Sequence, residues 1–93
     1  MRKEEVERIQ GLLAANGRYK GAIDGVAGPK TVAAAHGLLT TRLPNAFGWS
    51  LDRQLVAAAQ LILQFAGHPV GDIDGYWGNQ TNGAYLEWAT EYF

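Results

Sequence analysis

The chain has 93 residues and a mass of 10.1 kDa, which suffices for one domain but not for two separate cores. With 47% hydrophobic and 18% charged residues, the composition is that of a globular protein, and the absence of cysteine excludes disulfides and thiolate chemistry. A net charge of −1 argues against a phosphate-binding nucleic-acid partner. No apolar run reaches the roughly 18–20 residues of a membrane span, and the charged start does not resemble a signal peptide. We therefore expect no nucleic acid, no membrane, no export signal in this chain and no cofactor or metal.

Charge is distributed unevenly along the chain. Residues 1–46 hold seven Lys/Arg and four acids, a net charge of +3, whereas residues 47–93 hold one Arg and five acids, a net charge of −4. One half of the molecule is therefore suited to attract carboxylates, although two opposed solvated faces would give the same pattern.

The sequence repeats itself at an offset of 50 residues. Aligning 1–43 with 51–93 without a gap gives twelve identities, against about three expected by chance at ordinary residue frequencies. They are Val6/Val56, Gln10/Gln60, Leu13/Leu63, Gly17/Gly67, Gly21/Gly71, Ile23/Ile73, Asp24/Asp74, Gly25/Gly75, Gly28/Gly78, Thr31/Thr81, Ala34/Ala84 and Thr40/Thr90. We interpret this pattern as an internal duplication.

Each half predicts helix, loop, helix in chain order. A first helix has Glu4 and Glu5 in its opening turn and stops at Gly17, and a second starts after Gly28 with Pro29. A connector, residues 40–50, precedes a third helix that Ser50 caps and Gly67 ends. The fourth follows Gly78, with a core-facing stripe of Ala84, Tyr85, Trp88 and Tyr92. The prediction is a single all-α domain over 1–93, a small helical domain of two helix–loop–helix half-repeats sharing one core.

The loop between the paired helices carries the most specific motif, Ile-Asp-Gly-x-x-Gly-x-x-Thr. Asp-Gly is a turn signal, because the carboxylate accepts backbone N–H groups two residues on and glycine takes a positive φ. Ile23 and Ile73 are expected to be buried anchors. A calcium loop is disfavoured, because aligning Gly75 with its sixth position leaves Val70 and Thr81 where acidic ligands are required. A zinc site at His68, Asp72 and Asp74 lacks a second histidine.

The repeated pattern Val-x-x-x-Gln-x-x-Leu, Gly, Ile-Asp-Gly-x-x-Gly-x-x-Thr-x-x-Ala resembles the peptidoglycan-binding domain of bacterial wall hydrolases and phage endolysins. Both copies match it over most of the chain. The chain departs from the family in lacking Phe-Gln on the second helix and in its long connector. The resemblance implies a small helical module that anchors a lytic enzyme to the cell wall and has no catalytic residues.

The matched residues are expected to hold the loops rather than to contact ligand. This structural set is Asp24, Gly25, Gly28, Thr31, Asp74, Gly75, Gly78 and Thr81, and Gln10 and Gln60 are expected to bind loop backbone. Ligand contacts are predicted where the copies differ, because aromatic rings suit sugar faces, amides suit N-acetyl groups and cations suit stem-peptide carboxylates. These residues are Arg18, Tyr19, Lys20, Trp49, Tyr76, Trp77, Asn79 and Gln80. Trp77 fits surface contact and core packing equally, and Trp88 is expected in the core.

The leading hypothesis is a non-catalytic module that binds peptidoglycan, through its glycan strand, stem peptide or both, at the cell wall or in the periplasm. It would anchor a hydrolase domain in the same or another chain. A protein–protein interaction module with the same fold is the alternative. A small muramidase would need a positioned pair of carboxylates, and Glu4, Glu5 and Glu7 lie on a solvated helix start.

Overall fold

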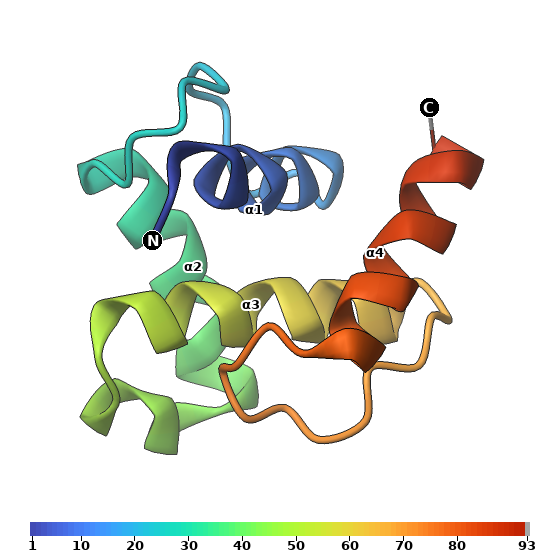
Figure 1. The fold of residues 1–93 in the computed structure, drawn as a ribbon. Coiled ribbons are helices and arrows are strands. Elements are labelled where there is room, and N and C mark those ends of the chain that lie inside the picture. Colours follow the sequence, from blue (N-terminus) through green and yellow to red (C-terminus); the bar gives the residue numbers. More distant parts are fainter. Residues whose placement is uncertain (93) are drawn as a thin grey trace.

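Helix α3 (Leu51–Phe65) lies at the centre of the fold. A computed structural model describes residues 1–92, and it is all-helical over that range. Every residue from Gln54 to Leu63 is buried, because α3 contacts each of the other three helices. Figure 1 shows α3 in yellow, with α1 (Lys3–Ala15) above it and α4 (Asn79–Tyr92) crossing its C-terminal end at the right. The predicted all-α class and its four helices are therefore confirmed.

The helices begin and end where the sequence signals predict. Gly17 and Gly67 take φ values of +80° and +89° just beyond the ends of α1 and α3, the left-handed conformation in which glycine ends helices. The Ser50 hydroxyl accepts the backbone N–H of Arg53 and caps α3. Helix α2 (Pro29–Arg42) begins directly after Gly28.

The connector is shorter than predicted. Helix α2 continues to Arg42, so the first residues of the predicted connector, from residue 40, are helical. A 3-10 helix, η1 (Pro44–Gly48), fills most of the remainder and buries Ala46. The predicted second half-repeat ends at Phe93, which lies outside the described residues.

One cluster of buried side chains draws on all four helices and η1, including Leu13, Leu39, Ala46, Leu63 and Trp88. Trp88 is buried, as predicted. Two other burial predictions are wrong. Ile23, between α1 and α2, is 47% exposed beside a hollow that Tyr85 and Trp88 also line, and Tyr92 is 57% exposed in the last turn of α4.

The two halves are packed differently. Helix α2 packs closely against both α1 and α3, whereas the backbone of α4 is close to α3 alone among the helices of residues 1–92. The duplication therefore stays a prediction from the sequence. None of the described helices is both long and apolar enough to cross a membrane.

Candidate functional site

The loop joining α1 to α2, residues 16–28 (the first loop), is held by one buried glutamine. Gln10 Oε1 accepts the backbone N–H groups of Asp24 and Gly25 at 3.1 and 3.0 Å. Its Nε2 lies 3.0 Å from Asp24 Oδ1, from the Val26 carbonyl and from Thr31 Oγ1. Gln10 therefore supplies the donors and acceptors that the turn needs, as the sequence predicts.

The loop joining α3 to α4, residues 66–78 (the second loop), has nearly the same network. Gln60 Oε1 accepts the N–H of Gly75 at 2.9 Å, and Nε2 donates to Asp74 Oδ1, the Tyr76 carbonyl and Thr81 Oγ1 at 3.0–3.2 Å. Since both glutamines are buried and committed to the loops, neither is available to a ligand.

The two aspartates close their turns as expected. Asp24 Oδ1 accepts the N–H of Val26 at 3.0 Å, and Asp74 Oδ1 accepts that of Tyr76 at 2.9 Å. These backbone hydrogen bonds, followed by those from Gln10 and Gln60, lower the pKa of each carboxyl below its ordinary value, because they favour the ionised form. Both aspartates act within the scaffold.

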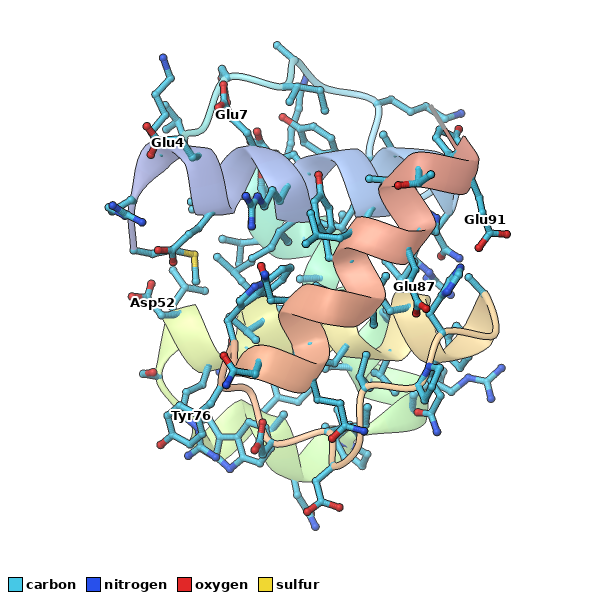
Figure 2. All side chains as sticks on the ribbon, turned by 45° about the vertical axis from the view of Figure 1, so that its right-hand side comes forward. Glu4, Glu7, Asp52, Tyr76, Glu87 and Glu91 are labelled. Carbon is cyan, nitrogen blue, oxygen red and sulfur yellow. The ribbon has the colours of Figure 1, made fainter. Side chains whose placement is uncertain are left out.

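The two loops lie on opposite sides of the molecule. Figures 1 and 2 agree in placing the first loop above α1 and the second loop below α3. The predicted contacts Arg18, Tyr19 and Lys20 are therefore far from Tyr76 and Trp77, and the two sets form separate surfaces.

Beside the second loop, Arg53 of α3 contacts two predicted contact residues, one of them in the connector. Its guanidinium carbon lies 4.0 Å from the ring centroid of Trp49 and 4.4 Å from that of Tyr76. Its Nη2 and Nε donate to the Asp74 carbonyl at 2.8 and 3.2 Å. We call Trp49, Arg53 and Tyr76 the aromatic stack. Tyr76 remains 60% exposed, so the stack fixes a ring that stands in solvent at the edge of the molecule (Figure 2).

Trp77 has a packing role instead. Its indole Nε1 donates to Asn82 Oδ1 at 3.1 Å, and Arg8 Nη1 donates to the same oxygen at 3.2 Å. The Trp77 ring is half-buried, 5.7 Å from the ring of Tyr85. Asn79 and Gln80 are exposed in the first turn of α4.

The first loop borders hollows in the surface of the molecule. Two adjoining hollows of about 420 and 400 Å³ share Tyr19, Gly21 and Lys30 as walls, and we call them together the first-loop groove. Both volumes fall within the roughly 300–1,000 Å³ of small-molecule sites. Tyr19 is 7% exposed and donates its hydroxyl to the Ala22 carbonyl, so it forms a wall rather than the projecting loop tip that was expected.

Sequence reasoning missed Arg53 and Lys30 as candidate site residues. Arg53 follows Trp49 by four residues and is the one cation of residues 47–93, which was an available signal. Lys30 lies in the first turn of α2, and the sequence alone does not show that this turn borders a groove.

Within residues 1–92 no three metal-ligating side chains gather. His68 pairs with Glu91 at 3.0 Å and with Glu87 at 3.7 Å, both on α4 (Figure 2), and not with Asp72 or Asp74. Glu4 and Glu7 border a hollow of about 530 Å³ that Tyr85 and Trp88 also line.

Comparison of the chain with protein-family models, curated proteins and solved structures gives no match.

Proposed function

We propose that this protein is a non-catalytic module that binds peptidoglycan and anchors a wall-degrading or wall-remodelling activity to murein. The proposal starts from the repeated motif, which resembles peptidoglycan-binding domains in both copies. It places the protein's action at the bacterial cell wall and assigns catalysis to a separate domain, in the same chain or another, such as that of a phage endolysin.

The observation that carries the proposal is the aromatic stack. An exposed tyrosine ring backed by a fixed cation loses little conformational freedom when a ligand covers its free face, so more of the contact energy goes into binding. Sugar rings present C–H-rich faces that pack on aromatic rings. Asn79 and Gln80, which follow the second loop, offer amides that match the donor and acceptor of an N-acetyl group.

The scaffold supports the same proposal. The repeated residues Gln10 and Gln60 are engaged inside the loops, whereas Val26 and Tyr76, which differ between the copies, have exposed side chains. This division is typical of a binding module, in which a rigid frame presents variable contact residues.

Co-sedimentation with purified sacculi tests the proposal. The wild type is expected to be retained. Tyr76→Ala is expected to reduce the free energy of binding to sacculi by about 1–3 kcal/mol, the range for the loss of an aromatic anchor. Tyr92→Ala is the matched control, since Tyr92 is 57% exposed and stacks on Trp88 in the last turn of α4, outside the aromatic stack.

Circular dichroism establishes that each variant is folded. Wild type that stays in the supernatant at every sacculus concentration contradicts wall binding. Retention onto beads carrying a protein partner, with none on sacculi, would favour the protein-interaction alternative. Dye release from labelled sacculi by the wild type would contradict the non-catalytic assignment.

A further inference from the structure

The rim of the first-loop groove is cationic, whereas the corresponding positions of the second half are not. The scaffold residues Gln10, Asp24 and Thr31 recur fifty residues later and make matching hydrogen bonds. The rim does not recur. Its cations are Arg18, Lys20 and Lys30, and the residues fifty positions later are His68, Val70 and Gln80. Two loops with the same frame therefore present different chemistry.

The three cations are not neutralised by the protein. Across residues 1–92 none of them takes part in an ion pair. Arg18 Nε donates to Asn16 Oδ1 at 3.0 Å, which orients the guanidinium and leaves its terminal nitrogens for another acceptor. The one carboxylate lining the groove, Asp24, accepts from Val26 and Gln10 through Oδ1. The rim keeps an excess of positive charge.

The walls of the groove are largely apolar. Tyr19 forms a buried wall common to both hollows, and Val26, Pro29 and Ala33 contribute small aliphatic surfaces. A groove of this size with apolar walls and a cationic rim matches a short peptide that has small side chains and free carboxylates.

We propose that the first-loop groove binds the stem peptide of peptidoglycan through its carboxylates, with Arg18 and Lys30 as the principal partners. This inference rests on the proposed function, since it names the part of peptidoglycan that this side of the molecule recognises. It assigns the peptide to the first loop and leaves the aromatic stack, on the opposite side, to the glycan.

Isothermal titration calorimetry of the full chain tests this assignment with two ligands. One is a synthetic stem peptide with free carboxylates (the acid), and the other is the same peptide with every carboxylate converted to a carboxamide (the amide). The free acid is expected to bind roughly tenfold more tightly than the amide, the effect of one charge-assisted hydrogen bond. Lys30→Gln introduces the residue found at position 80. It should weaken binding of the acid by a similar factor of roughly ten and leave binding of the amide unchanged. The Arg18→Gln, Lys30→Gln double variant should remove the preference for the acid.

Arg42→Gln is the matched control, because it removes the same charge from a residue whose guanidinium lies over Phe65 instead. Equal binding of acid and amide by the wild type, or wild-type binding by the folded double variant, would overturn the assignment. Should a variant fail to fold, the wild type still decides, since its affinity for the acid must fall with rising salt.

Sacculus retention, measured in parallel, separates this inference from the proposed function. Retention of the wild type without peptide binding refutes the groove assignment and leaves wall binding standing. Peptide binding without retention supports the groove assignment and refutes wall anchoring.

Discussion

Gln10 binds Asp24 at two points: its Nε2 donates to the Asp24 carboxylate at 3.0 Å, and its Oε1 accepts the Asp24 backbone N–H at 3.1 Å. One buried amide thus fixes both the side chain and the backbone of the turn residue. Because a buried donor or acceptor without a partner is costly, the first loop depends on the helix that precedes it by hydrogen bonds as well as by chain connection.

Removing either buried glutamine should destabilise the domain. We expect Gln10→Ala and Gln60→Ala to lower the free energy of unfolding by at least about 1–3 kcal/mol, since loop N–H groups lose their acceptor. Gln64→Ala is the matched control, because Gln64 is exposed near the end of α3, and it should change stability by less than about 0.5 kcal/mol. Urea denaturation followed by circular dichroism measures all three, and equal stability of Gln10→Ala and Gln64→Ala would contradict the scaffold role.

Two glycines of the second half should respond to alanine in opposite directions. Gly75 has φ +78°, and a Cβ there would lie 2.7 Å from the Arg53 carbonyl oxygen, so Gly75→Ala should cost at least about 1–2 kcal/mol. Gly83 lies within α4 with open space around it, so Gly83→Ala should stabilise the protein by about 0.5–1 kcal/mol. Thermal melts test the pair, and a destabilised Gly83→Ala would contradict an open position for Gly83 on α4.

Low pH should lower the free energy of unfolding, because it protonates the aspartates that hold the two loops. Hydrogen bonds from the Val26 and Tyr76 backbones, then from Gln10 and Gln60, lower the pKa values of Asp24 and Asp74 in the folded protein. A lowered folded pKa contributes stability that is fully present above the unfolded pKa, about 3.9, and is lost as pH falls through the folded pKa.

The wild type should therefore lose stability below about pH 4, and the Asp24→Asn, Asp74→Asn double variant should show a shallower loss. Urea midpoints measured between pH 6 and pH 2 test this. Asp72→Asn is the control, since Asp72 accepts no hydrogen bond within residues 1–92. A double variant with the acid dependence of the wild type would show that the two carboxylates do not hold the turns.

The first half should not fold alone. Residues 1–46 would lose α3, against which both α1 and α2 pack, and would expose Leu13 and Leu39. At about half the length of the chain, the fragment is near the limit below which a single core fails. Its circular dichroism should show weak helicity and no cooperative melt, and a sharp transition would mean that α3 is not the common core.

The fold was largely predictable because its signals are local. Periodic apolar residues, the Ser50 cap and the stops at Gly17 and Gly67 depend on neighbours within a few residues. The roles of Gln10 and Gln60 were predictable as well, because the fifty-residue offset placed each one before the same turn.

The exposed positions of Tyr76, Asn79 and Gln80 agree with the sequence prediction, but the contacts at the surfaces depend on packing between distant elements. The sequence does not show that Arg53 lies between Trp49 and Tyr76, that Asn82 engages Trp77, or that Tyr19 turns inward. Nor does it show that α4 leaves Tyr92 exposed, since a helical stripe indicates which residues share a face but not how much of that face is covered.

An NMR titration with soluble disaccharide–peptide fragments of peptidoglycan tests wall recognition most directly, because it reports binding and its location together. The three tryptophan indole N–H signals serve as site reporters, since Trp49 lies in the aromatic stack, Trp77 donates to Asn82 and Trp88 is buried in the core. The account predicts saturable shifts for the Trp49 indole and for the backbone amides of residues 74–76, with the Trp88 indole unmoved. Unchanged spectra at millimolar fragment, or shifts confined to the last turn of α4, far from Asn79 and Gln80, would contradict it.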